Sequence, residues 1–250
     1  SGNTSGYIIG VNEDNTYGAP DKAWMYNLSP GFSPISTTSV NDDGWHQVVG
    51  VRGNGVIKIF VDGIPGESSQ TDQGLGNPPP GTPLVIGGLS AGGIPVPYYT
   101  GLIDDVQVYD HALADAEVEW LFDHPGQVVC APLPTDTVSQ WKAEGNASDF
   151  IGSNNGTLVN GTGFASGKIG QAFSFDGTDD YVTITDQSSL QPAQYSVGAW
   201  VKPSAAETDG ALIVYKQGAA AGGYGSYILW IINTDTGNYT YRARATMDGA

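Results

Sequence analysis

The sequence predicts an all-β protein with one short helix, and three observations carry this prediction. The composition is rich in Gly, Thr, Asn and Tyr and poor in Leu, Lys and Glu, which favours strands and turns over helices. Asp62-Gly63 lies between two apolar runs, the pattern of a hairpin with a type I′ turn. Residues 101–122 change from strand-like to helical spacing part-way along.

Residues 101–122 are expected to form a strand followed directly by the helix. The apolar residues of the first part alternate imperfectly with polar ones, as in a strand with one buried face: Ile103, Val106 and Val108. Those of the second part follow helical spacing: Leu113, Val118, Leu121 and Phe122. Asp115 and Glu117 place negative charge in the first helical turn, and Pro125-Gly126 ends the helix.

The rest of the chain reads as further short strands. Residues 44–51 alternate in the manner of a central strand covered on both faces, whereas residues 29–38 are rich in Ser, Pro and Thr and are expected to be irregular. Residues 6–11, 24–26 and 56–61 are also predicted strands, and residues 224–233 look like the first of them. Residues 6–12 and 224–233 are similar to each other, which indicates a weak internal repeat.

Two stretches carry a resemblance to a known family. Gly101-Leu-Ile-Asp-Asp-Val-Gln-Val-Tyr109 resembles the last strand of a laminin-G-like, concanavalin A-type module, and residues 168–184 resemble its opening strands. The resemblance implies an antiparallel β-sandwich of the jelly-roll type. In it, residues 138–146 match the first strand and the loop beyond it, and further family-like segments are 84–88, 154–158, 172–176, 181–184 and 195–201. The family's end precedes its beginning in this chain, and Ala114 stands where relatives usually have a serine as the helix cap.

The inverted order predicts a back half in residues 1–125, a linker in 126–138 and a front half in 139–250. The two halves could close on each other as one circularly permuted domain, which is the arrangement that we favour. Alternatively, they could be parts of two tandem modules, each completed by a neighbouring chain. Isolated half-sandwiches would expose sheet edges and an apolar face, so something must complete them.

Charge and composition limit the partners. The formal net charge of −17 makes nucleic acid and anionic membranes unexpected partners. No apolar run has the length of a membrane span, so membrane insertion is not expected. Cys130 is the only cysteine, so no disulfide can form within the chain. Bacterial extracellular β-modules often lack disulfides, and we expect a secreted or cell-surface location.

A structural calcium ion is the first site hypothesis. Calcium takes six to eight oxygen ligands, and clustered Asp and Gly residues supply them readily. The resemblance implies a calcium ion held by an Asp of the last strand, which matches Asp104, and by loops near the start of the module, which match Glu144 and Asp176-Gly177. The alternative is that these acids are ordinary solvated or turn residues.

A carbohydrate-binding surface is the second site hypothesis. Sugars are bound by aromatic rings that stack on their C–H faces and by polar groups that hydrogen-bond their hydroxyls. Six aromatic residues lie in loops or beside them: Trp24, Tyr26, Tyr98, Tyr99, Tyr239 and Tyr241. Tyr and Trp are also common strand residues, so each could instead be a packed rim or core residue.

Catalysis is not expected. A glycosidase needs two carboxylates at a controlled separation, and the E-[ILV]-D-x-x-E strand motif of laminarinase-type glucanases does not occur in this sequence. The sequence therefore predicts a non-catalytic extracellular module of a larger protein, which binds a polysaccharide or surface glycan or mediates adhesion. The alternative is a purely structural repeat whose partners are neighbouring copies in a filament or layer. A glycoside hydrolase is the least favoured reading.

Overall fold

The computed structural model describes residues 7–10, 24–27, 34–40, 42–66, 70–71, 81–88, 98–126, 137–204, 211–217, 226–233 and 241–246. The elements in chain order are β1 (Tyr7–Gly10), β2 (Trp24–Asn27), β3 (Ile35–Ser39), β4 (His46–Gly53), β5 (Val56–Val61), β6 (Ile64–Pro65), β7 (Gln70–Thr71), β8 (Leu84–Ile86), β9 (Thr100–Tyr109), α1 (Asp115–Asp123), β10 (Thr137–Trp141), β11 (Gly156–Val159), β12 (Gly163–Ser166), β13 (Gln171–Asp176), β14 (Tyr181–Ile184), the 3₁₀ turn η1 (Ser188–Leu190), β15 (Tyr195–Pro203), β16 (Leu212–Gln217), β17 (Ser226–Asn233) and β18 (Tyr241–Thr246).

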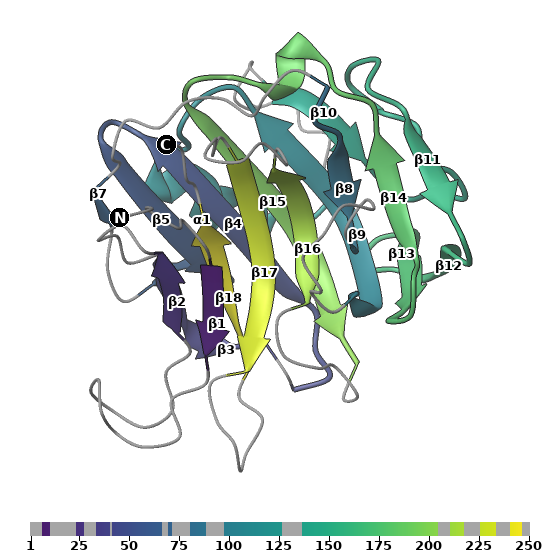
Figure 1. The fold of residues 1–250 in the computed structure, drawn as a ribbon, viewed down its shortest axis with the longest axis horizontal. Coiled ribbons are helices and arrows are strands. Elements are labelled where there is room, and N and C mark those ends of the chain that lie inside the picture. The colour runs from purple at the N-terminus through teal and green to yellow at the C-terminus, as the bar shows by residue number, and fades with distance from the viewer. Residues whose placement is uncertain are drawn as a thin grey trace, which may run out of the picture.

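Two large antiparallel sheets lie face to face and form a β-sandwich (Figure 1). The nine-stranded sheet has the order β12-β13-β9-β15-β4-β5-β6, with β10 paired to β9 and β7 paired to β5. The seven-stranded sheet has the order β11-β14-β8-β16-β17-β18-β3, and β1 and β2 form a separate pair. The expected all-β sandwich with one short α-helix is therefore confirmed.

Strands from the two sides of residues 126–138 alternate within both large sheets. β9 lies between β13 and β15, and β8 lies between β14 and β16, although β8 and β9 precede that segment and their neighbours follow it. In this structure each half of the chain thus covers the strand edges that the other half would expose.

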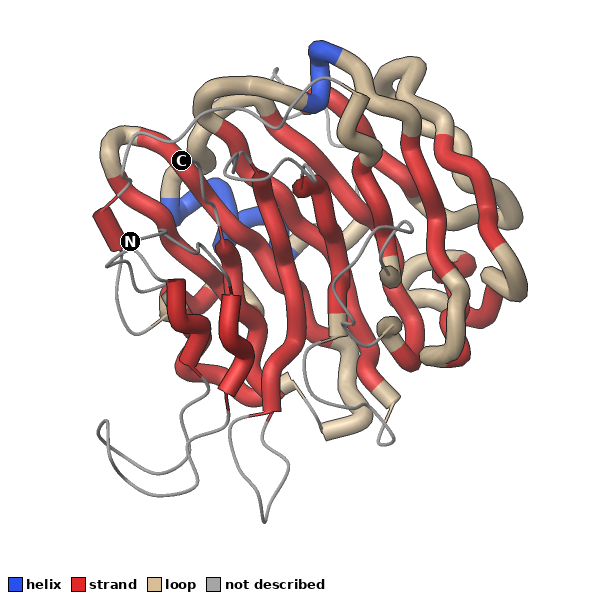
Figure 2. Tube along the Cα trace, in the orientation of Figure 1, coloured by secondary structure: helices blue, strands red, loops and turns tan. Residues whose placement is uncertain are grey.

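The main core fills the space between the sheets. It includes Ile103, Trp141, Phe173 and Val197, each of which is fully buried. The indole Nε1 of Trp141 donates a hydrogen bond to the carbonyl oxygen of Asn154 at 2.8 Å, so its polar atom is satisfied. A smaller core lies on the outer face of the nine-stranded sheet. There Val118 and Leu121 of α1, with Leu113 just before the helix, pack on Val49, Val51, Phe60 and Tyr109. Figure 2 shows how little of the fold is helical compared with its strands.

Local sequence explains the elements nearest the sites. All eight residues of β4 are buried, which confirms a strand covered on both faces. Asp62 and Gly63 have φ values of 54° and 74°, as the predicted type I′ turn requires. Helix α1 starts after Ala114, whose backbone N–H donates to Glu117 Oε2 at 2.7 Å; alanine supplies no side-chain cap of its own.

A β-bulge interrupts β9 at its two aspartates. Between the pairs Gly198–Gln107 and Trp200–Asp104, β15 has one residue and β9 has two. Asp105 has φ 50°, and the extra residue lets both Ile103 and Val106 reach the main core. Asp104 and Asp105 are only 1% and 6% exposed, so Asp104 is not the solvated acid of the alternative interpretation.

Some strands were not expected. The region predicted to be irregular contains β3, which ends the seven-stranded sheet and, among the described strands, pairs with β18 alone. This segment forms a strand by pairing with β18, even though its sequence is mostly Ser and Thr. β12, β16 and β18 were also missed. The two similar segments occupy different places, because β1 pairs with β2 while β17 lies within the seven-stranded sheet.

Candidate functional site

The turn between β12 and β13, residues 167–170, receives two of the predicted calcium ligands. Asp104 projects from β9 and accepts a hydrogen bond from the backbone N–H of Ile169 at 3.0 Å through Oδ2. Glu144 follows β10, and its carboxylate oxygens accept the N–H of Gln171 at 3.3 and 3.4 Å. Both carboxylates therefore face the same turn.

Glycines in this turn leave room for the two carboxylates. A Cβ on Gly167 would lie 2.6 Å from Asp104 Oδ2, and a Cβ on Gly170 would lie 2.0 Å from Glu144 Oε1. Gly170 also has φ 55°, which disfavours other residues. The donor set is made of carboxylates on a glycine turn that a side chain would fill, and this fits a hard cation such as Ca²⁺.

The electrostatics at Asp104 reflect its burial. The pKa of Asp104 is raised to about 7, because burial, and to a smaller extent the charge of Asp105, outweigh the lowering effect of the hydrogen bond from the Ile169 N–H. A cation at this turn would stabilise the ionised carboxylate.

Asp176 and Gly177 do not join this group, so the four-residue ligand set is corrected. Asp176 ends β13 opposite Thr100, whereas Gln171, beside Glu144, begins the same strand. Five strand residues span about 17 Å at roughly 3.4 Å per residue, far more than a calcium–oxygen distance of about 2.5 Å. β13 therefore separates the two predicted parts of the site.

Asp176 lies instead in an acidic turn between β13 and β14. One ligand atom from each of Asp176, Asp179 and Asp180 lies within 4.8 Å of the others. Asp180 is 2% exposed and accepts backbone N–H groups from Gly161 at 2.6 Å and from Asp176 at 3.2 Å. Asp180 thus ties this turn to Gly161 in the turn between β11 and β12. The side chains of Asp176 and Asp179 are exposed.

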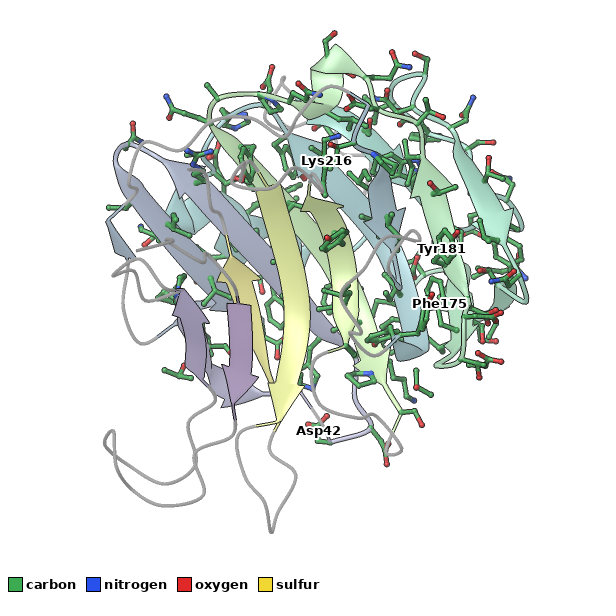
Figure 3. All side chains as sticks on the ribbon, viewed as in Figure 1. Asp42, Phe175, Tyr181 and Lys216 are labelled. Carbon is green, nitrogen blue, oxygen red and sulfur yellow. The ribbon has the colours of Figure 1, made fainter. Side chains whose placement is uncertain are left out.

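Tyr98 and Tyr181 form an aromatic pair beside this acidic turn. Their ring centroids are 6.5 Å apart with an interplanar angle of 26°, and both side chains are half-buried. Tyr98 packs closely over Gly88, where a Cβ would come within 2.6 Å of the tyrosine ring. We call Tyr98, Tyr181, Asp176 and Asp179 the tyrosine–aspartate patch. Figure 3 shows Tyr181 on β14, towards one edge of the sandwich.

The other predicted sugar-binding residues have different outcomes. Tyr99 is fully buried, donates a hydrogen bond to the carbonyl of Leu102 at 3.2 Å and packs edge-on against Phe175. It is a core residue, so its assignment to a binding surface is wrong. Tyr239 and the side chains of Trp24, Tyr26 and Tyr241 lie outside the described residues. Sequence reasoning missed Tyr181; its position directly after Asp179-Asp180 was the available signal.

A small cavity lies between α1 and the nine-stranded sheet. Its volume is about 40 Å³, and its lining includes Gln47, Asp105, Gln140 and Trp200. Asp105 accepts hydrogen bonds from Gln140 Nε2 at 2.6 Å and from Gln107 Nε2 at 2.8 Å. Ligand pockets usually measure about 300–1,000 Å³, so this cavity suits water rather than a sugar.

Comparison with known families agrees with this architecture. The model of the Laminin_G_3 family, described as the concanavalin A-like lectin/glucanases superfamily, matches residues 1–119 and 176–249. The chain belongs to this superfamily. The two matched segments of this concanavalin A-like protein fit the permuted order inferred from its sequence. No curated protein matches the chain. Among the described residues, no helix has the length and hydropathy needed to span a membrane.

Proposed function

We propose that this concanavalin A-like chain is a non-catalytic, extracellular carbohydrate-binding module, and that the tyrosine–aspartate patch is its binding surface. The observation that carries the proposal is the stacked Tyr98–Tyr181 pair, in which Tyr181 directly follows the turn that carries Asp176 and Asp179. Superfamily membership supports carbohydrate binding in general terms. Adhesion to a glycan-coated surface would be the role of the parent protein.

The patch combines the two chemical features that sugar recognition needs. Tyrosine rings offer apolar surface for the C–H face of a sugar, and exposed carboxylates accept hydrogen bonds from its hydroxyls. The Tyr98 ring is held in place by close packing over Gly88 and against Tyr181. Because the rings are pre-organised, little side-chain entropy would be lost on binding.

Glycan-array screening followed by calorimetric titration of the best ligand tests this function. Tyr181→Ala should weaken binding about tenfold or more, which corresponds to ~1.4 kcal/mol. Phe150→Ala is the matched control, because Phe150 is also aromatic and is 56% exposed, but lies outside the patch. Equal affinity of the wild type and Tyr181→Ala for every bound glycan would exclude the patch as the binding surface.

We also propose that the turn of residues 167–170 holds a structural calcium ion between Asp104 and Glu144. Calcium would neutralise two carboxylates that the fold brings to one turn. It should raise the melting temperature of the wild type and have little effect on Glu144→Gln. Asp176→Asn, at the other end of β13, is the control and should respond to calcium as the wild type does. A wild-type melting temperature that calcium leaves unchanged would contradict this site.

A structural repeat remains the second candidate, because Phe150 and Ile151 are neighbouring apolar residues that are 56% and 46% exposed. If they mediate contacts between copies, light scattering should detect oligomers that Phe150→Asp disperses. A monomer at all concentrations, with glycan binding, would favour the carbohydrate-binding module.

A further inference from the structure

His46 lies between two aspartates and contacts one with each ring nitrogen. Nδ1 is 2.7 Å from Asp62 Oδ2, and Nε2 is 2.8 Å from Asp42 Oδ1. The His46 side chain is 9% exposed, that of Asp62 is 19% exposed and that of Asp42 is 66% exposed. The histidine is thus enclosed, while one of its partners lies at the surface.

The Asp42 end of this group is shaped by the connection between β3 and β4. Asp42 Oδ1 also accepts the backbone N–H of Gly44 at 2.8 Å, and Asp43 has φ 60°. A Cβ on Gly44 would lie 2.6 Å from Asp42 Oδ1. The turn therefore depends on glycine to bring this carboxylate to His46. Figure 3 shows Asp42 near one end of the sandwich.

The Asp62 end is the hairpin turn between β5 and β6. Asp62 Oδ1 accepts the N–H of Gln47 at 2.9 Å, and the Asp62 N–H donates to the Gln47 carbonyl at 2.9 Å. A Cβ on Gly63 would lie 3.3 Å from the Cα of Glu119, so α1 packs against this turn. His46 thereby connects two turns, and one of them supports the helix.

The protonation state of His46 decides whether both contacts can exist. A carboxylate only accepts hydrogen bonds, and an imidazolium donates from both nitrogens, whereas a neutral imidazole has one N–H and one lone pair. On deprotonation the nitrogen without a proton would face a carboxylate and repel it. Asp62 is also held by Gln47 and is less exposed, so Asp42 is the partner that leaves.

Other charged groups lie near but do not replace these partners. Asp43 is exposed beside Asp42, and Glu119 approaches the Asp62 turn through its backbone. Lys202 follows Val201, the residue of β15 that pairs with His46 of β4. β18 packs near β4 and carries Arg242 and Arg244, whose side chains lie outside the described residues. Only Asp42 and Asp62 bond the imidazole in the described part of the chain.

We propose that Asp42, His46 and Asp62 form a proton-dependent clasp. With His46 protonated, the clasp joins the β3–β4 turn to the β5–β6 turn; with His46 neutral, Asp42 separates and the β3–β4 turn is released. The direction of the His46 pKa shift agrees with this proposal. Burial lowers the pKa of His46, but its hydrogen bonds to Asp62 and Asp42, together with their charges, raise it above 6.5 overall. The clasp is therefore closed below pH 6.5 and opens as the pH rises through the folded-state pKa.

Nuclear magnetic resonance titration of the full chain tests this proposal. The His46 ring signals and the Gly44 backbone amide should change with the same midpoint, because Gly44 donates to the carboxylate that leaves. Asp42→Asn should move the His46 midpoint to lower pH and abolish the matching change at Gly44. Asp42 is exposed, so this variant should fold.

Asp43→Asn is the matched control, because it removes one negative charge from the same turn without touching the imidazole. It should leave the His46 midpoint almost unchanged. Gly44→Ala should shift that midpoint as Asp42→Asn does, by displacing the carboxylate without altering charge. Equal midpoints in the Asp42→Asn and Asp43→Asn variants, or a Gly44 amide that does not follow the His46 titration, would overturn the clasp.

Discussion

Replacing Lys216 should destabilise the protein more than replacing any exposed lysine. The Lys216 side chain is fully buried on β16, and its Nζ lies 2.6 Å from Asp186 Oδ1 and 2.5 Å from the carbonyl oxygen of Thr82. Asp186 also accepts the N–H of Gly81 at 2.7 Å. The group joins a loop before β8 to segments that follow the linker, towards the opposite end of the sandwich from Asp42 (Figure 3).

The expected cost follows from what Lys216→Met leaves behind. Breaking a buried ion pair by removing one partner usually costs about 3–5 kcal/mol, because the other charge loses its compensation. Asp186 keeps hydrogen bonds from Gly81 and from Gln191 Nε2, and its side chain is 11% exposed. Because of these contacts, we expect Lys216→Met to lower the free energy of unfolding by about 3 kcal/mol, at the lower end of that range.

Urea unfolding of single and double variants measures this cost. Lys58→Met is the control, because Lys58 and Asp115 form an exposed pair at 2.6 Å that should contribute about 0–1 kcal/mol. In the Lys216→Met, Asp186→Asn cycle, the coupling energy should exceed about 1 kcal/mol. A Lys216→Met loss no larger than that of Lys58→Met, with no coupling to Asp186, would refute the assigned ion pair.

Three further changes test other parts of the fold. Asp149→Asn should lower the melting temperature at pH 7. Burial raises the pKa of Asp149, but hydrogen bonds from the backbone N–H groups of Gly152, Gln140 and Asn154 lower it by more, so the ionised carboxylate stabilises the fold. This stabilisation is lost as the pH falls below 3.8, so the difference in melting temperature between the wild type and Asp149→Asn should narrow in acid. Ala114→Ser should complete the cap of α1 and stabilise the protein by about 1 kcal/mol in urea unfolding; no gain would contradict the cap geometry. Gly87→Ala should destabilise by about 2–5 kcal/mol, because Gly87 has φ 79° and a Cβ there would lie 2.4 Å from the Phe175 ring; a neutral effect would contradict this packing.

The elements with strong local signals were predictable from sequence. The Asp62-Gly63 turn, the fully covered strand β4 and the change from β9 to α1 each depend on periodicity or turn chemistry within a few residues. β3 was not predictable in this way, because its pairing with β18 brings together segments from opposite ends of the chain. The burial of Asp105 likewise depends on a bulge opposite β15, which no local pattern shows.

The candidate site was only partly predictable for the same reason. Family resemblance put Asp104, Glu144 and Asp176 in one ligand set. The carboxylates of Asp104 and Glu144 do face the same turn, whereas Asp176 lies at the opposite end of β13. Tyr98 was chosen as a loop aromatic, but its partner Tyr181 lies on β14, far along the chain, and the two rings come close only in the folded protein. Tyr99, one residue later, faces the core.

Calorimetric titration of the wild type and Tyr181→Ala with the strongest array-selected glycan tests the central claim most directly, with Phe150→Ala measured alongside. The account predicts that wild type and Phe150→Ala bind alike and that Tyr181→Ala binds about tenfold or more weakly while keeping its melting temperature. Undiminished binding by a folded Tyr181→Ala variant, or no glycan bound by the wild type at all, would contradict it.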